Sequence, residues 1–295
     1  MPDIHFGDNL EIIRGFDSES FELIYIDPPF NTGKSQSRTQ TKTYRDDAGD
    51  RIGFKGQRYK TVRVGAKSFD DQFDDFLGFI EPRLREAHRL LTPDGSLFFH
   101  IDPRESHYCK ILLDEIFGRD SFINEIIWSY DYGARSKKKW STKHDTIFWY
   151  AKNPKSYTFN FDAIDRIPYM APGLVGAEKA AIGKTPTDVW WNTIVSPTGK
   201  EKTGYPTQKP LNILNRIISV HSNPGDRVLD FFAGSGTTGV AAWNNNRDFT
   251  LIDSNPEAIE VLAKRLTDAQ PHIQSASAVE CPHNSRSDIA IEVKS

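Results

Sequence analysis

Hydrophobic residues in this chain are grouped in two ways, which predict strands and helices in alternation. Short apolar runs rich in β-branched and aromatic residues are typical of buried strands, and they lie at 21–26, 96–101, 122–130, 146–150, 227–232 and 249–252. Apolar residues at helical spacing predict helices over about 73–91, 105–117, 211–218, 237–244 and 256–267. The alternation indicates an α/β fold with a mostly parallel sheet and helices on both faces.

Three segments break this alternation. Residues 31–67 show no clear periodicity and are rich in Gly, Thr, Gln and Arg, so we predict a long loop there. Residues 130–205 mix short β-rich runs with scattered Pro and Gly, which indicates an irregular insertion rather than a second domain. After about residue 269 the chain is poor in apolar residues, so a disordered tail is expected over 270–295.

The composition is that of an ordinary soluble protein, and 295 residues suffice for one large domain with a smaller insertion. No apolar run approaches the roughly 20 residues that span a bilayer, and the N-terminus lacks a secretory signal. The two cysteines, Cys109 and Cys281, give neither zinc-ligand spacing nor a disulfide framework. We therefore expect a cytoplasmic protein without a membrane segment or a bound metal.

Charge is unevenly distributed, and this changes what the net charge of −3 implies. Residues 31–67 contain ten basic and three acidic side chains, and residues 131–152 contain six basic and two acidic ones. Aromatic residues such as Tyr44, Tyr59 and Trp140 lie within or beside these blocks. Basic segments with interleaved aromatics suit a nucleic acid, although either block alone could be a solvated loop.

The candidate for chemistry is Asp27-Pro28-Pro29-Phe30, directly after the apolar run 21–26. A carboxylate and an aromatic ring at a strand exit can hold and stack a flat, amine-bearing ring. The prolines restrict the backbone and leave carbonyl groups free to accept hydrogen bonds. The alternative is a proline-rich turn with an Asp that caps a helix, and this tetrapeptide alone does not decide between them.

A second candidate is the strand, glycine-rich turn and helix start at 228–238. Glycines let a ligand approach the backbone, and a helix N-terminus offers free N–H groups. Asp253 ends the next strand, where a carboxylate can hold ribose hydroxyls. Gly234, Gly236 and Gly239 also spell the G-x-G-x-x-G pattern of nicotinamide enzymes, so an NAD-dependent oxidoreductase stays open at this point.

Together these motifs resemble the DNA amino-methyltransferases that use S-adenosylmethionine, in the permuted class called beta. Asp27–Phe30 resembles their D-P-P-[YF] motif, and Asp230–Thr238 (DFFAGSGTT) resembles their cofactor motif. Gly204–Pro210 is similar to the motif before the cofactor strand, and Gly7-Asp8 to one near the cofactor adenine. The resemblance covers roughly 3–267, with Phe30 where Tyr is common.

The resemblance implies a Rossmann-like methyltransferase fold and a division of the chain. Residues 1–129 would be the catalytic half, including a mobile basic loop at 31–67 that closes over DNA. Residues 130–205 would recognise the target sequence, and residues 206–269 would be the cofactor-binding half, followed by the tail.

The resemblance also assigns roles to single residues. Asp27, Pro28, Pro29 and Phe30 would be catalytic. S-adenosylmethionine would be bound around the turn and by polar groups near it, namely Asp8, Thr207, Lys209, Phe232, Ala233, Gly234, Ser235, Gly236, Thr237 and Asp253. Asp253 would take the ribose hydroxyls, Asp8 the adenine amine, and Thr207 with Lys209 the methionine carboxylate. DNA would be contacted by Arg135, Lys137, Lys138, Lys139 and Lys143.

The implied activity is methyl transfer to the N6 amine of an adenine that is flipped out of double-stranded DNA. N4-cytosine methylation is the main alternative, because Asp27 favours adenine only by resemblance. A catalytically inactive DNA-binding protein is another. A cognate restriction endonuclease and a homodimer are partners that the resemblance suggests.

Neither cysteine is expected to be catalytic. His100 and Asp102 could line the site or simply end a strand, and Trp190-Trp191 is predicted to pack in the core.

Overall fold

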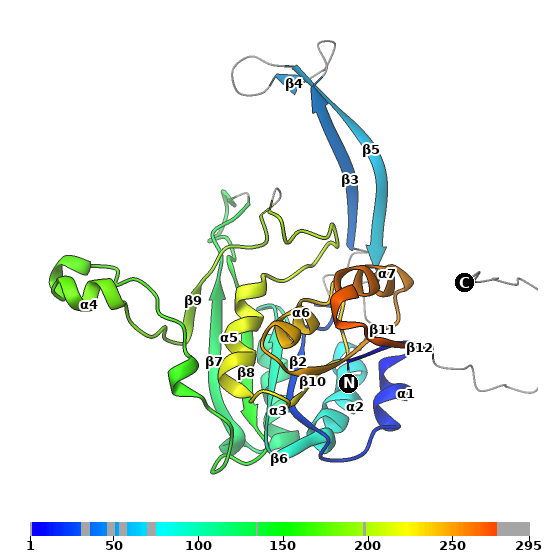
Figure 1. Ribbon diagram of the computed structural model, residues 1–295, viewed down its shortest axis with the longest axis vertical. Coiled ribbons are helices and arrows are strands. Elements are labelled where there is room, and N and C mark those ends of the chain that lie inside the picture. The colour runs from blue at the N-terminus through cyan, green and yellow to red at the C-terminus, as the bar shows by residue number, and fades with distance from the viewer. Residues whose placement is uncertain are drawn as a thin grey trace, which may run out of the picture.

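The structure, a computed structural model, describes residues 2–30, 36–45, 51–52, 58–69, 75–133, 135–196 and 199–275. Within these residues, nine strands form one sheet in the order β12-β1-β11-β10-β2-β6-β8-β7-β9 (Figure 1). The strands are β1 (Asp3–Phe6), β2 (Phe21–Ile26), β6 (Leu91–Ile101), β7 (Phe122–Ser129), β8 (His144–Ala151), β9 (Val189–Trp191), β10 (Arg227–Asp230), β11 (Asp248–Asp253) and β12 (His272–Ser275). Among these paired strands, only β8 runs antiparallel to its neighbours, so the sheet is mostly parallel.

Helices cover both faces of the sheet, as expected for an α/β fold. They are α1 (Asn9–Arg14), α2 (Phe76–Leu90), α3 (Ser106–Phe117), α4 (Ala177–Ile182), α5 (Leu211–His221), α6 (Thr237–Asn244) and α7 (Pro256–Arg265). One apolar cluster joins α5, α6 and α7 to the sheet, and a second joins α1, α2 and α3 to its other face. Among the described helices, none is long and apolar enough to cross a membrane.

Strand β2 shows why the central run is apolar without interruption. Leu23 and Tyr25 point into the first cluster, whereas Ile24 and Ile26 point into the second. All four side chains are almost completely buried. A strand between two helical layers must be apolar on both faces, so its polar residues gather where it ends.

The order of the strands places a crevice at the carboxyl end of β2. Strands β2 and β10 are parallel neighbours. From β2 the chain continues to β6 on one side, and from β10 it continues through α6 to β11 on the other. Ligands bind at such a switch point in open α/β sheets, because the two connections diverge there. Asp27 and the glycine-rich turn are therefore brought to one place.

The prediction of a long loop over 31–67 is wrong for the described residues. Strands β3 (Gln36–Arg45), β4 (Arg51–Ile52) and β5 (Arg58–Phe69) form a separate antiparallel sheet that projects from the body (Figure 1). Its register runs from Gln36 opposite Phe69 to Arg45 opposite Tyr59. These strands lack apolar alternation because they do not lie on the main core, so the periodicity on which strand prediction depends is absent.

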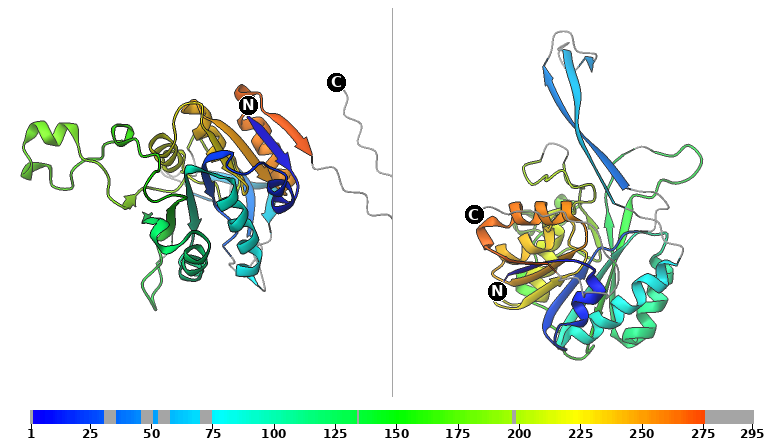
Figure 2. Two further views of the ribbon diagram at one scale, coloured as in Figure 1. Left: turned by 90° about the horizontal axis from the view of Figure 1, so that it is seen from below. Right: turned by 90° about the vertical axis from the view of Figure 1, so that its right-hand side faces the viewer.

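The expected insertion at 130–205 contains part of the main sheet. Strand β8 lies between β6 and β7, and β9 extends the edge. Residues 152–165 stay against the body, where Thr158 and Asn160 donate backbone hydrogen bonds to Asp94 and Val220, and Asp165 pairs with Arg216. The part that leaves the body, closed by the bridge between Ile167 and Lys184, carries α4 away to one side (Figures 1 and 2). At the other end of the chain, β12 pairs with β1, so the expected tail over 270–295 begins too early. Residues 276–295 lie outside the described part of the chain.

Candidate active site

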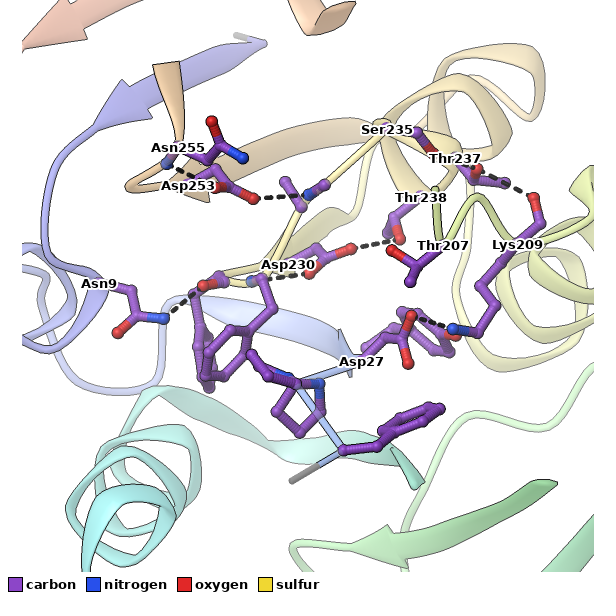
Figure 3. A pocket seen from close by; sticks show the side chains of 18 of the residues that line it. Asn9, Asp27, Thr207, Lys209, Asp230, Ser235, Thr237, Thr238, Asp253 and Asn255 are labelled. Carbon is purple, nitrogen blue, oxygen red and sulfur yellow. Dashed lines mark hydrogen bonds and ion pairs between the residues drawn. The ribbon is translucent and has the colours of Figure 1, made fainter. Parts of the chain in front are cut away.

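A cavity of about 750 Å³ opens at the carboxyl ends of β2 and β10 (Figure 3). A volume of this size is typical of small-molecule sites. The sequence-predicted residues that line it are Asp8, Asp27, Pro28, Pro29, Phe30, Thr207, Lys209, Phe232, Ala233, Gly234, Ser235, Thr237 and Asp253. Motifs that are about two hundred residues apart in the sequence thus share one cavity.

Gly236 is the predicted cofactor residue that does not line the cavity. It precedes α6 with φ 74°, a left-handed conformation that favours glycine. A Cβ atom there would lie 2.3 Å from a methyl carbon of Leu262. The expectation that Gly236 contacts the cofactor is therefore not supported by its position, since this glycine lets α6 pack against α7.

Asp27 has two carboxylate oxygens in different surroundings. Its Oδ2 forms an ion pair with the Nζ atom of Lys209, and both side chains are largely buried. Within the described part of the chain, its Oδ1 is buried and has no hydrogen-bond partner. A buried carboxylate oxygen without a donor is uncommon, because it has lost water without replacement. The free oxygen belongs to a residue that lines the cavity, so a ligand can supply the donor.

Lys209 is held in place by hydrogen bonds to its segment from α6 and within the segment itself. The hydroxyl of Thr237 donates a hydrogen bond of 3.1 Å to the carbonyl oxygen of Lys209, at the start of α6. Gln208 accepts from the backbone N–H and the hydroxyl of Thr203, both at 2.8 Å, which folds the segment back on itself. The Nζ atom of Lys209 lies 4.9 Å from the centre of the Phe30 ring. Lys209 therefore contacts Asp27 and Phe30, whereas its predicted contact with a methionine carboxylate stays a prediction.

Asp253 supports the glycine-rich turn. Its Oδ2 accepts from the backbone N–H of Gly234 at 2.7 Å, and its Oδ1 from that of Asn255 at 2.8 Å. Gly234 has φ 49°, and a Cβ atom there would lie 3.3 Å from the ring of Tyr205. Burial raises the pKa of Asp253, and backbone hydrogen bonds from Asn255 and Gly234 oppose this rise. Asp253 thus shapes the turn as well as lining the cavity.

Asp230 is the buried carboxyl group beneath the turn. It accepts from the hydroxyl of Thr238 at 2.6 Å and from the backbone N–H of Phe232 at 3.0 Å. Burial raises its pKa to about 7, and the carboxylates of Asp27 and Asp253 add to the rise. Burial disfavours the charged form, so Asp230 is neutral in a large part of the folded molecules near neutral pH.

This raised pKa predicts a pH-dependent stability. The pKa of Asp230 is about 7 in the folded protein and 3.8 as a free side chain. The folded state therefore holds the proton more tightly, and the stabilisation is complete below pH 3.8 and lost as the pH rises through about 7. Replacing Asp230 by Asn should remove this dependence, which amounts to at most roughly 4 kcal/mol.

Chemical denaturation of the parent and the Asp230→Asn variant at several pH values measures the effect. As the pH rises across this range, the unfolding free energy of the parent should fall relative to that of Asp230→Asn. The exposed Asp17→Asn serves as the control, because it removes a carboxylate that lies outside the cavity. A constant difference between parent and Asp230→Asn would contradict the assignment.

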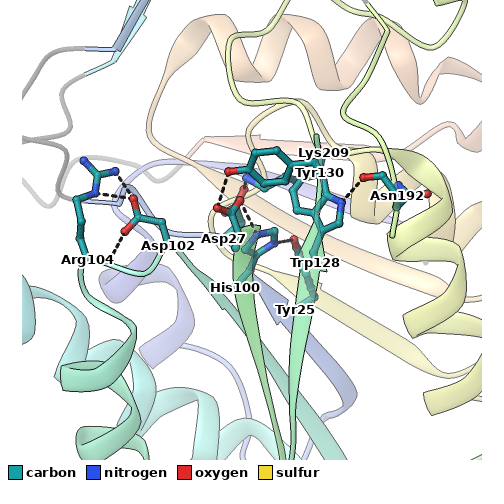
Figure 4. A network of polar contacts seen from close by, with 10 residues as sticks. Tyr25, Asp27, His100, Asp102, Arg104, Trp128, Tyr130, Asn192 and Lys209 are labelled. Atoms are coloured by element: carbon teal, nitrogen blue, oxygen red, sulfur yellow. Dashed lines mark hydrogen bonds and ion pairs between the residues drawn. The ribbon is translucent and has the colours of Figure 1, made fainter. Parts of the chain in front are cut away.

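A buried polar network forms another wall of the cavity (Figure 4). The hydroxyl of Tyr25 and Nδ1 of His100 are 2.7 Å apart, and Nε2 of His100 is 3.2 Å from Oδ2 of Asp145. Tyr130 donates from its hydroxyl to Oδ1 of Asp145 at 3.1 Å. Tyr25, Tyr130 and Asp145 line the cavity. The network holds the Tyr130 ring in the wall of the cavity that Asp27–Phe30 also line.

The charges in this network follow from its contacts. Burial acts to raise the pKa of Asp145, but the hydrogen bond and charge of His100, with Lys209 and Tyr130, outweigh it and the pKa is lowered. Burial and Asp145 raise the pKa of Tyr130 well above its usual value. Asp145 is thus a carboxylate and Tyr130 a hydrogen-bond donor at neutral pH.

The sequence left open whether His100 and Asp102 line the site, and the structure gives a different answer for each. His100 is fully buried and bonded within the sheet, so it supports the site from behind. Asp102 lines the cavity and pairs with Arg104. Of the tryptophan pair, Trp190 is buried as predicted, whereas Trp191 is 75% exposed.

Several residues of the cavity were assigned no individual role from the sequence. They include Asn9, Tyr25, Arg83, Tyr130, Asp145, Tyr205 and Asp230. Arg83 left a usable signal, because a charged residue lies on the apolar face of the helical pattern between Ile80 and Leu84. Its Nε donates to Oδ1 of Asn9 at 2.6 Å, and Nδ2 of Asn9 donates to the carbonyl of Phe231 at 2.6 Å. This chain ties α2 to the cofactor motif.

The predicted DNA-binding residues lie outside the cavity, in the connection 131–143 between β7 and β8. Arg135, Lys137, Lys138 and Lys139 are exposed, and Lys143 is partly buried. The guanidinium of Arg135 pairs with Asp131 at 2.7 Å. Tyr130 and Asp145, at the two ends of this connection, line the cavity. Contact of the basic residues with DNA stays a prediction.

Cys109 is buried, and burial raises the pKa of its thiol to about 12, with Glu105 and Asp102 adding to the rise. The thiol therefore stays protonated at neutral pH and is a poor nucleophile. Cys281 lies outside the described residues.

Comparison with known proteins gives the family. A family model described as DNA methylase matches residues 21–265. The chain is 32% identical over 275 residues to the DNA adenine methyltransferase YhdJ of Escherichia coli (strain K12), covering 88% of this chain and 81% of that protein. It is 30% identical over 257 residues to the Type II methyltransferase M.HpaI of Haemophilus parainfluenzae, covering 87% and 71%.

Solved structures agree on the fold. The M1.HpyAVI–SAM complex superposes with a TM-score of 0.58 at 24% identity, covering 90% of this chain and 99% of that one. The cytosine-N4-specific PvuII DNA methyltransferase gives 0.62 at 15% identity, covering 94% and 95%. Because the family model spans most of the chain and two relatives reach 30% identity over most of their length, the chain belongs to the DNA methylase family.

Proposed function

We propose that this protein transfers a methyl group from S-adenosylmethionine to the N6 amine of an adenine flipped out of double-stranded DNA. The observation that carries the proposal is the environment of Asp27. One of its oxygens is paired with Lys209, and the other is buried without a donor, in a cavity shared with the glycine-rich turn. The name of YhdJ as a DNA adenine methyltransferase supports adenine as the base.

The cavity fits S-adenosylmethionine in charge and shape. Six carboxyl groups line it against three cations, so a positively charged ligand is favoured there; they are Asp8, Asp27, Asp102, Asp145, Asp230 and Asp253, against Arg83, Arg104 and Lys209. The left-handed Gly234 lets a ligand approach the turn. When bound, S-adenosylmethionine would supply an electrophilic methyl group on a sulfonium.

Asp27 would act on the amine of the base. Its free oxygen can accept one amine hydrogen, and the carbonyl of Pro28 can accept the other. These bonds draw the nitrogen towards tetrahedral geometry and make its lone pair available. As positive charge develops on the nitrogen, the carboxylate stabilises it, which is an electrostatic contribution to the transition state. The amine must then lose one proton, and Asp27 is placed to receive it.

Phe30 would replace part of the stacking that the base loses. Flipping a base costs a few kcal/mol of unstacking and unpairing. The Phe30 ring lines the cavity, with His100 5.8 Å behind it between ring centres. Stacking requires only the aromatic face, so Phe is a suitable replacement for the Tyr that is common in this motif.

The projecting hairpin would contact the DNA backbone. Strands β3, β4 and β5 contain no acidic residue but eight basic ones, namely Arg38, Lys42, Arg45, Arg51, Arg58, Lys60, Arg63 and Lys67. The hairpin and the connection 131–143 extend from the same side of the body (Figures 1 and 2). Phosphate contacts supply much of the affinity for DNA, so we propose that the duplex lies between these two basic segments.

Three further points belong to this proposal. The catalytic motif precedes the cofactor motif in the sequence, which supports the permuted beta-class order. Relatives named Type II methyltransferases support a cognate restriction endonuclease. We also propose that the protein is cytoplasmic and that residues 130–205 recognise the target sequence. We propose that it forms a homodimer, which light scattering of the purified protein tests.

Incubating the protein with labelled S-adenosylmethionine and unmethylated genomic DNA tests the function. Nucleoside analysis should detect N6-methyladenine, and mapping of the modified bases should give one recognition sequence. Label in N4-methylcytosine would move the assignment to the other amine. A folded protein that labels no DNA from any of several diverse genomes would reject the proposal.

A further inference from the structure

An exposed tryptophan lies in the connection 131–143. Trp140 is 97% exposed, although indole is among the side chains with the largest apolar surface. The connection begins after Tyr130 and ends before Asp145, two residues that line the cavity. Trp140 is therefore presented to solvent beside the proposed base pocket and does not take part in the core.

The segment that carries Trp140 is held by local hydrogen bonds. The backbone N–H of Ser136 donates to the hydroxyl of Ser141 at 2.7 Å. The hydroxyl of Ser136 accepts from the backbone N–H groups of Lys138 and Lys139 at 3.2 and 3.3 Å. These bonds close a turn immediately before and after Trp140. The ring is therefore displayed by an ordered turn, and less conformational entropy is lost when it binds.

The surroundings of Trp140 indicate a polyanion with stacked rings. Lys137, Lys138 and Lys139 directly precede it and are exposed. Three adjacent cations suit the phosphates of a nucleic acid, and an indole ring suits its bases, because base–aromatic stacking is favourable for any base. An anionic lipid surface could use the same two features, and nucleic acid is favoured here because the turn adjoins the cavity proposed to hold a base.

The ring is within reach of the stack from which the target base would leave. Trp140 lies five positions before Asp145, which is part of the cavity wall. A fully extended chain spans at most about 3.6 Å per residue, so Trp140 lies within about 18 Å of that wall. A base that enters the cavity leaves a gap in the duplex close to the cavity mouth, and unstacked neighbours there have lost favourable contacts.

We propose that Trp140 inserts into the duplex beside the target base and stacks in the gap that the flipped base leaves. This inference rests on the proposed function and adds to it the residue that stabilises the open duplex. Apolar side chains that wedge between base steps are a known physical solution to unstacking. Lys137, Lys138 and Lys139 would hold the adjacent phosphates while the ring enters.

The test compares two duplexes that contain the mapped recognition site. One is fully paired, and the other has an abasic site opposite the target base, so that the base can leave without breaking a pair. Single-turnover methylation by Trp140→Ala should be slower by about tenfold or more on the paired duplex, the size expected for one lost stacking contact. On the abasic duplex most of the rate should return. Trp140→Phe, which keeps an aromatic ring, should retain most of the rate on both.

Two further measurements separate this role from others. Tyr108→Ala removes another exposed aromatic ring, on α3, and should leave both rates unchanged. Lys138→Ala should weaken binding of both duplexes equally and reduce the salt dependence, as for a phosphate contact. With 2-aminopurine at the target position, fluorescence should rise when the parent binds and rise less with Trp140→Ala, and this signal does not depend on methyl transfer.

The outcomes distinguish the two proposals. A parent that methylates both duplexes establishes the function independently of Trp140. An equal loss of rate on both duplexes, or parental rates for Trp140→Ala on the paired one, would then overturn the insertion of Trp140. A parent that binds and methylates neither would instead reject the proposed function, and with it this inference.

Discussion

Replacing Asp27 by Asn should reduce methyl transfer by about a thousandfold or more, because it removes the charge that stabilises the developing positive nitrogen. The substitution keeps the size of the side chain. Binding of S-adenosylhomocysteine should stay within about threefold of the parent, because the turn and Asp253 are unchanged. Single-turnover kinetics on DNA and calorimetric titration with S-adenosylhomocysteine measure the two quantities separately.

The same substitution should also reduce stability, for a reason that does not involve catalysis. The ammonium group of Lys209 would lose its partner, and only 11% of its side chain is exposed. An unpaired charge in such a position is destabilising by about 1–3 kcal/mol. The double variant Asp27→Asn with Lys209→Met should recover this stability but none of the activity. Such a result separates the catalytic charge from the structural ion pair.

Asp120→Asn is a suitable control, because Asp120 is exposed and lies outside the cavity. It should match the parent in rate, cofactor binding and unfolding midpoint. An Asp27→Asn variant that methylates DNA at a rate near that of the parent would show that another group acts on the amine.

Replacing Asp253 by Ala should weaken binding of S-adenosylhomocysteine by about a hundredfold, the size expected when hydrogen bonds to a charged acceptor are lost. Two effects combine. The ribose hydroxyls would lose their acceptor, and the backbone N–H groups of Gly234 and Asn255 would lose theirs. The turn would then no longer be held in the shape that admits the ligand.

Calorimetric titration gives the affinity, and thermal unfolding without ligand gives the contribution of the turn. Glu260→Gln provides the control, because Glu260 is an exposed carboxylate on the neighbouring helix α7. If Asp253→Ala bound the ligand as tightly as the parent, the ribose contact and the bracing of the turn would both be excluded as sources of affinity.

Much of the fold could be predicted because its determinants are local. Strand β2 is apolar without interruption since both of its faces are buried, and α5 has apolar residues at helical spacing since one of its faces is. The hairpin β3–β5 could not be predicted in this way. It does not lie on the main core, so its sequence does not alternate between apolar and polar residues. Its strands are recognised from the backbone pairing of β3 with β5.

The glycine pattern shows how one motif depends on another. Gly234, Gly236 and Gly239 alone also favour a nicotinamide enzyme. The combination with Asp27–Phe30 indicates a methyltransferase, and the DNA methylase family confirms this interpretation. The three glycines also differ in their roles. Gly234 lines the cavity, whereas a Cβ atom at Gly236 or Gly239 would meet the side chains of Leu262 or Leu251.

The sequence by itself determined the α/β class, the family and the two motifs that meet at the cavity, because strand exits, glycine turns and short tetrapeptides are local patterns. Only the tertiary structure decided which side chains meet. Lys209 pairs with Asp27 across 182 positions of sequence, and Arg83 reaches Asn9 from the buried face of α2. The physical reason is that these contacts depend on which strands are neighbours in the sheet, and no local pattern specifies that order.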